Sequence, residues 1–152
     1  MIQNNIFLKL IFSILITHTS AIAADKCAEI SEKQMAEWMD KEPSMPSLSF
    51  LIKAKKLIDA KRSYSLSLGG DKRAHCYLGC IISAEVDFET ANFVAWQKEF
   101  SDATDCTPKT HFEIADYDAT IKGAIKGAIK GSEKSLIPKT KNLCADFCKK
   151  AY

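Results

Sequence analysis

Two pairs of cysteines with the same spacing constrain the fold of this chain more than any other feature. Three residues separate Cys76 from Cys80, and three separate Cys144 from Cys148. On a helix, residues four apart point the same way with Cβ atoms about 5–6 Å apart, whereas a disulfide needs these atoms about 4 Å apart. Neither pair is therefore expected to close on itself. Two such helices that lie side by side can instead be linked twice.

The directions of those two helices decide which cysteines meet. For antiparallel helices the predicted bonds are Cys76–Cys148 and Cys80–Cys144, which leaves Cys27 to pair with Cys106. Six cysteines allow 15 pairings, so this connectivity is a hypothesis from helix geometry. Zinc binding is the alternative use of clustered cysteines. Disulfides form in oxidising compartments, so the location of the protein helps to decide between disulfides and zinc.

The N-terminal residues have the pattern of a secretory signal peptide. Lys9 is the one charged side chain before an apolar run from Leu10 to Ile16, and Ala21-Ile22-Ala23 is a small-x-small cleavage site. The run is too short to remain as a membrane-spanning helix, and the charged residues before Cys27 do not fit a lipid-attachment site. We predict cleavage after Ala23, a mature domain of residues 24–152, and a periplasmic or secreted location.

Compartment and charge exclude several classes of protein. Export into an oxidising space favours three disulfides over free thiols or zinc thiolates, and the even number of cysteines agrees with this. Lys and Arg number 21 against 19 Asp and Glu, so no basic surface for nucleic acid is expected. After the leader, no apolar run is long enough to cross a membrane, so no transmembrane segment is expected in the mature chain.

The rest of the sequence predicts an all-α domain of five to six helices held by three disulfides. Apolar residues recur at intervals of three and four, and no useful stretch alternates with period two. Ser31 with Gln34 has the pattern of a capping box, and Asp71 and Asp87 are expected N-caps. The main helices are expected at 48 to about 61, 71 to about 86, 88–102, from about 112, and 141–152.

An Ile-Lys-Gly-Ala repeat places glycines at four-residue intervals in the long helix, at Gly123, Gly127 and Gly131. Glycine in a helix costs about 1 kcal/mol relative to alanine, so the stripe needs a packing reason. We predict that another helix approaches closely here. A basic membrane-active segment is the alternative, but its apolar face would be thin.

Five polar residues are expected to lie close together. Asp71 and His75 share one face of a helix, and Glu99 and Asp102 share one face of the next. If these two helices form an antiparallel hairpin, His75 lies level with Asp102, and Asp116 near the start of the long helix can join them. Buried acids beside a histidine are costly unless they are paired or functional, so the cluster is either structural or an active site.

These residues resemble a pattern in the YfiM-type bacterial envelope lipoproteins and, more remotely, the VanZ-like proteins. There, Asp-Lys-x-x-His on one helix precedes Lys-Glu-x-x-Asp on the next and an Asp-headed segment with spaced glycines. The matching residues, within 71–127, are Asp71, Lys72, His75, Lys98, Glu99, Asp102, Asp116, Gly123 and Gly127. The resemblance implies a helical envelope protein. This chain departs from it in lacking a lipid-attachment cysteine and in having six cysteines.

A second resemblance, to secreted phospholipase A2, implies a hydrolase. In that family a histidine on a disulfide-linked helix activates water, and an aspartate from the antiparallel neighbour orients it. Gly69-Gly70, His75 and Asp102 are similar to that arrangement. Cys76 stands where that family has a calcium-binding aspartate, which argues against calcium-assisted ester hydrolysis.

The leading expectation is a non-enzymatic exported protein: a periplasmic binding or envelope-associated protein, of the inhibitor or immunity type, with a protein partner in the cell envelope. The alternative is a small hydrolase in which His75 is the general base and Asp102 orients it, with Glu99 or Asp71 as acid or metal support. No cofactor is expected, and the residues leave open whether a metal binds.

Overall fold

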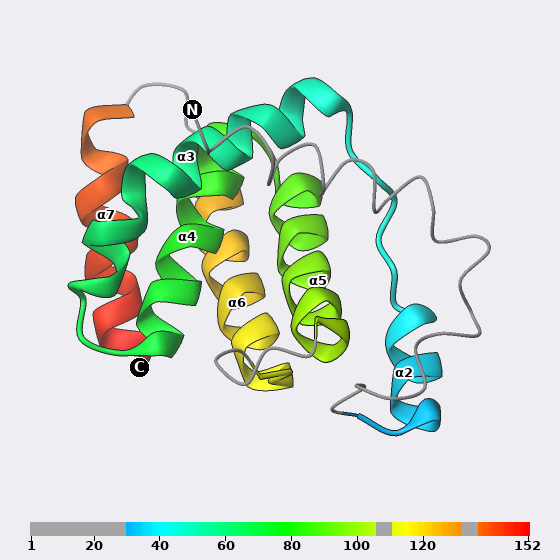
Figure 1. Ribbon diagram of the computed structural model, residues 1–152. Helices are drawn as coiled ribbons and strands as arrows, with labels where there is room; N and C mark the ends of the chain where they lie inside the picture. Colours follow the sequence, from blue (N-terminus) through cyan, green and yellow to red (C-terminus); the bar gives the residue numbers. More distant parts are fainter. Residues whose placement is uncertain (1–29, 106–110, 132–136) are drawn as a thin grey trace, which may run out of the picture.

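The structure is a computed structural model that describes residues 30–105, 111–131 and 137–152 (Figure 1). Within these residues it contains helices and no strand, which confirms the predicted all-α class. The helices are α2 (Glu32–Met39), α3 (Leu48–Leu66), α4 (Asp71–Glu85), α5 (Phe88–Thr104), α6 (Ile114–Gly131) and α7 (Ile137–Ala151). None of these helices is both long and apolar enough to cross a membrane.

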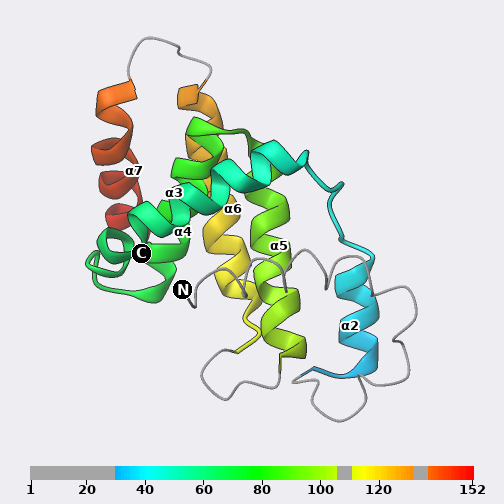
Figure 2. The same ribbon diagram turned by 45° about the horizontal axis from the view of Figure 1, so that its top comes forward.

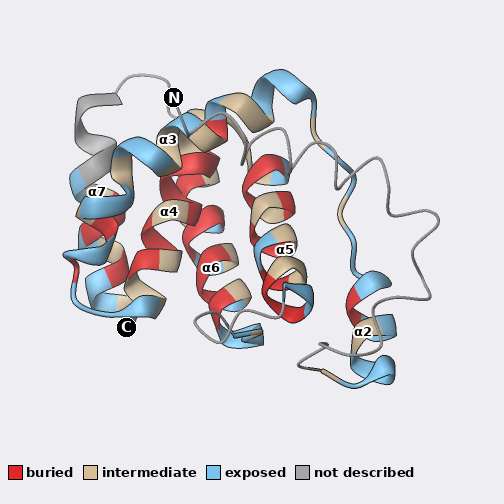
Figure 3. Ribbon diagram, viewed as in Figure 1, coloured by how far each residue is buried: buried red, intermediate tan, exposed pale blue. Residues whose placement is uncertain are grey.

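α4 is the central helix of the molecule. It packs against α3, α5, α6 and α7, and its most extensive contact is with α6 (Figures 1 and 2). Most of its residues from Ala74 to Ser83 are buried, and the buried faces of α4, α5 and α6 meet in the middle of the molecule (Figure 3). The core is therefore built around a helix that carries two of the cysteines.

Glycines bring α4 and α6 close together. A Cβ atom added at Gly123 would lie 1.9 Å from the carbonyl oxygen of Cys76, and one at Gly127 would lie 2.1 Å from that of Cys80. Side chains larger than hydrogen do not fit at either position. The predicted packing role of these two glycines is confirmed, while the surroundings of Gly131 lie outside the described residues.

The same contacts show that α4 and α6 run parallel. Gly123 lies against Cys76, and Gly127, four residues later on α6, lies against Cys80, four residues later on α4. The contacts therefore advance in the same direction along both helices. α4 also contributes a glycine that the sequence analysis did not single out, because a Cβ at Gly79 would lie 2.1 Å from the carbonyl oxygen of a residue on α6. Both helices therefore begin at the same end of the molecule.

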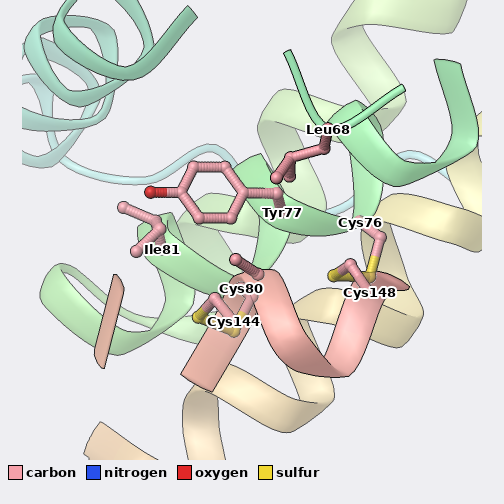
Figure 4. Packing of buried hydrophobic residues seen from close by; sticks show 8 residues of the cluster. Leu68, Cys76, Tyr77, Cys80, Ile81, Cys144 and Cys148 are labelled. Atoms are coloured by element: carbon pink, nitrogen blue, oxygen red, sulfur yellow. A yellow bond between two sulfur atoms is a disulfide. The ribbon is translucent and has the colours of Figure 1, made fainter. Parts of the chain in front are cut away.

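Two disulfides join α4 to α7, as predicted. Cys76 is bonded to Cys148 and Cys80 to Cys144, with Cα atoms 5.8 and 5.7 Å apart (Figure 4). This pairing requires α4 and α7 to be antiparallel, and all four cysteines are buried. The third predicted pair, Cys27 with Cys106, lies outside the described residues and stays a prediction.

A single tryptophan anchors α2 to the other helices. Trp38 is 2% exposed, stacks against Trp96 of α5, and makes edge contacts with Phe112 and Tyr117. The indole N–H of Trp96 donates a hydrogen bond to the carbonyl oxygen of Trp38 at 3.0 Å. α2 is therefore held by an aromatic cluster rather than by a long helix–helix contact.

Some helix boundaries differ from the sequence prediction. α3 continues to Leu66 instead of ending near residue 61, and it stops before Gly69, whose φ of 81° favours glycine. Asp71 is the first residue of α4 and not its N-cap, which is Gly70 without a side-chain hydrogen bond. The reason is that the carbonyl oxygen of Gly70 already accepts the first helical hydrogen bond, from the N–H of Ala74 at 3.1 Å, so Asp71 lies inside the first turn.

The other predicted caps are confirmed. Ser31 and Gln34 form a capping box at the start of α2, and the side chain of Asp87 accepts a hydrogen bond from the backbone N–H of Thr90 at the start of α5. α7 begins at Ile137, earlier than the predicted residue 141. Proline is tolerated in the first turn of a helix, where its missing N–H has no intrahelical partner, so the following proline does not delay the start of α7.

Candidate functional site

The beginnings of α4 and α6 and the end of α5 lie at the same end of the molecule (Figure 1). This follows from the parallel packing of α4 and α6 and from the short turn between α4 and α5, which reverses the chain. Polar side chains gather where α4 and α6 begin. We call the following residues the polar cluster: Asp71, Lys72, His75, Glu113, Asp116 and Thr120.

His75 lies between two carboxylates. Its Nε2 atom is 3.8 Å from Oδ1 of Asp71 and 3.7 Å from Oδ2 of Asp116. Its Nδ1 atom is 3.3 Å from Oγ1 of Thr120. The side chains of Asp71, His75 and Asp116 are 66%, 21% and 8% exposed, so the cluster runs from the solvent into the protein.

Thr120 decides which ring nitrogen of His75 carries a hydrogen. The hydroxyl of Thr120 donates to the carbonyl oxygen of Asp116 at 2.9 Å. A hydroxyl has one hydrogen to donate, so towards His75 it accepts, and Nδ1 is the donor. In the neutral ring, Nε2 then carries a lone pair that faces two carboxylates at distances too long for hydrogen bonds. This arrangement is stabilised by positive charge between the three groups, either a proton on Nε2 or a bound cation.

Lys72 holds the remaining oxygen of Asp116. Its Nζ pairs with Oδ1 of Asp116 and with Oε2 of Glu113. Burial opposes the ammonium charge, but the hydrogen bonds to these two carboxylates outweigh it and raise the pKa of Lys72 above its ordinary value. The cluster therefore contains one permanent positive charge and three carboxylates, and its excess charge is negative.

Glu99 and Asp102 of α5 form a second group beside the cluster. Oε2 of Glu99 accepts a hydrogen bond of 2.8 Å from the backbone N–H of Glu113, at the start of α6. Glu99 is 1% exposed, and burial raises its pKa to about 7. Asp102 pairs with Lys98 on its own helix, and burial raises the pKa of Asp102 although this lysine opposes the shift.

The structure brings three of the five predicted residues into one constellation. Asp71, His75 and Asp116 offer ligand atoms that all lie within 4.8 Å of one another, a separation at which they could hold a metal ion. The predicted orienting residue, Asp102, lies close enough for the charge of His75 to act on its pKa. The contacts described for the ring nitrogens, however, are with Asp71, Asp116 and Thr120.

Three members of the cluster were not predicted as site residues. Lys72 stands beside Asp71 in the sequence, and Glu113 and Thr120 stand three before and four after Asp116. On a helix this spacing places side chains on one face, which is the signal that could have identified the last two. Lys72 stands three before His75 and so gave the same signal, and it belongs to the Asp-Lys-x-x-His pattern, but its partners on another helix could not be read from that spacing.

Comparison with known proteins adds no family to this description. No protein-family model matches the chain, and searches of curated proteins and of solved structures find no significant match.

Proposed function

We propose that this chain is an exported binding protein and that the polar cluster binds a positively charged ligand. The observation that carries the proposal is the surroundings of His75, whose Nε2 faces the carboxylates of Asp71 and Asp116. The excess negative charge of the cluster favours a cation at this position. The two disulfides support a role in an oxidising compartment.

Binding is better supported than hydrolysis. In a histidine–aspartate dyad, the carboxylate accepts from one ring nitrogen and the opposite nitrogen is left to take a proton from water or substrate. Here the Nδ1–H of His75 is directed to Thr120, and Asp102 is paired with Lys98. An inhibitor-type or immunity-type role would use the same chemistry, with a lysine or arginine side chain of the partner protein entering the cluster.

The proposal is tested by NMR on the ¹⁵N-labelled mature chain with its disulfides intact. Addition of Zn²⁺ or of a lysine-rich peptide should shift signals of residues 71–75 and 113–120 more than those elsewhere. Asp116→Asn should weaken the response at least tenfold, because it removes a carboxylate that faces His75. Asp118→Asn is the matched control, since it removes an exposed acid from the same helix but outside the cluster.

Two results would contradict the proposal. The first is that neither Zn²⁺ nor the lysine-rich peptide shifts the NMR signals of the polar cluster. The other is an ester-hydrolysing activity of the wild-type protein that His75→Ala abolishes while the melting temperature is unchanged, which would favour the hydrolase.

A further inference from the structure

We infer that Asp71, His75 and Asp116 bind a zinc ion, through the carboxylate of Asp71, Nε2 of His75 and Oδ2 of Asp116. This inference rests on the proposed function and names the ligand of the same cluster. It depends on four features that the described residues supply: the donor set, the distances, the open side of the site, and the partners behind the ligands.

The donor set fits a borderline divalent ion. Magnesium and calcium prefer oxygen ligands alone, whereas imidazole nitrogen together with carboxylate oxygen suits zinc and its neighbours in the first transition series. Two carboxylates balance the two positive charges of the ion, so no net charge is placed beside the buried end of the cluster. Because the described cysteines are all bonded as disulfides, thiolates do not compete for the ion.

The distances are close to those of a bound ion. Two ligand atoms on one tetrahedral zinc ion, each about 2.0–2.1 Å from it, lie about 3.3 Å apart. In the structure Nε2 of His75 is 3.8 Å from Asp71 and 3.7 Å from Asp116. Each of these two distances has to shorten by about half an ångström, and the ligand oxygens of the two aspartates, which lie within 4.8 Å of each other, have to come to the same separation. The exposed side chain of Asp71 can supply most of this movement by rotation, and its exposure leaves room for a water molecule as fourth ligand.

The partners behind the ligands are those that metal sites use. A zinc-bound histidine donates its other ring N–H to an oxygen, and a zinc-bound carboxylate is hydrogen-bonded on its other oxygen. Thr120 accepts from Nδ1 of His75, which leaves Nε2 as the ligand atom. Lys72 binds Oδ1 of Asp116, the oxygen that does not face His75. The lysine therefore orients the carboxylate without occupying the position of the ion.

The test is titration of the metal-free mature protein with Zn²⁺ by calorimetry, with Co²⁺ as a spectroscopic substitute. We expect one zinc ion per molecule. Asp71→Asn and His75→Ala should each lower the affinity at least tenfold. Thr120→Val should lower it about 10–100-fold, as loss of a partner behind a ligand does at known metal sites. Asp118→Asn should leave the affinity unchanged.

A second readout follows the ring of His75 directly. The ¹⁵N signals of His75 should show a hydrogen on Nδ1 before zinc is added and a large shift of Nε2 afterwards, which a merely structural histidine would not show. Because Asp71 is exposed, Asp71→Asn is expected to fold normally and keeps the test decisive if His75→Ala does not fold.

The outcomes also separate this inference from the proposed function. Equal zinc affinity in the wild type, Asp71→Asn and His75→Ala would overturn the zinc site, as would a dissociation constant above about 1 mM. If the lysine-rich peptide still shifts the cluster in that case, the proposed cation-binding function stands without zinc. If neither cation shifts it, both proposals fail.

Discussion

At the residue scale, Glu99 links the stability of the protein to pH. Burial raises its pKa from 4.5 to about 7, so the folded state binds this proton more tightly than the unfolded state does. The stability that Glu99 contributes is therefore fully present below pH 4.5 and is lost as the pH rises to about 7. At about 1.4 kcal/mol per pKa unit, the loss is roughly 3 kcal/mol. Glu99→Gln keeps an oxygen for the backbone N–H of Glu113 and cannot ionise.

We expect Glu99→Gln to be more stable than the wild type at pH 8 and equal to it at pH 4. Urea unfolding at the two pH values measures the difference. Glu89→Gln, at an exposed position in the first turn of the same helix, is the control and should not change the pH dependence. The explanation is wrong if Glu99→Gln loses as much stability between pH 4 and pH 8 as the wild type.

At the element scale, the spacing between α4 and α6 depends on atoms that glycine lacks. In Gly123→Ala the added methyl group would lie 1.9 Å from the carbonyl oxygen of Cys76, so α6 has to move away from α4. Alanine gains about 1 kcal/mol in helix propensity, but overpacking a well-filled interface costs about 1–3 kcal/mol or more. We expect a net loss of about 2 kcal/mol, measured by chemical denaturation, together with weaker cation binding by the polar cluster.

The matched variant on the same helix is Ile125→Ala. Its side chain is 51% exposed, and we expect a change within about 0.5 kcal/mol. A Gly123→Ala protein as stable as Ile125→Ala would show that α6 can shift without cost.

The contacts between helices also explain how far the sequence alone could predict this protein. The pairing of Cys76 with Cys148 was predictable because helical spacing and disulfide geometry are both strict. The hairpin formed by α4 and α5 predicts that Asp102 lies level with His75. It does not predict which residues contact the ring of His75. α6 packs against both α4 and α5 at this end, and it presents Asp116 and Thr120 to His75 (Figure 1). Asp116 was expected at this end from the order of the helices, but the alignment that brings Thr120 to Nδ1 of His75 has no signal in the local sequence.

At the scale of the whole molecule, the two disulfides close nearly the same loop. Cys76–Cys148 spans 72 residues and Cys80–Cys144 spans 64. In the chain-entropy model the first bond stabilises the fold by about 4 kcal/mol, and the second by much less because the chain ends are already held together. We expect replacement of either pair by alanine, which adds no polar group to this buried position, to cost about 1 kcal/mol, and replacement of both to cost at least about 4 kcal/mol.

Guanidinium unfolding of the two paired variants and of the fourfold variant measures these costs. The single-pair variants act as controls for each other, because each keeps one bond between α4 and α7. Costs that simply add, about 4 kcal/mol for each pair, would contradict the shared-loop explanation.

The shared loop has a consequence for proteolysis. A peptide bond cut anywhere between Cys80 and Cys144 leaves two fragments, and each fragment carries one half of both disulfides. The fragments stay covalently joined, with α4 still bonded to α7. After one cut in that range, a reducing gel would therefore show two shorter fragments. In the oxidising compartment where the protein is expected to work, the cut molecule would stay in one piece, heavier only by one water.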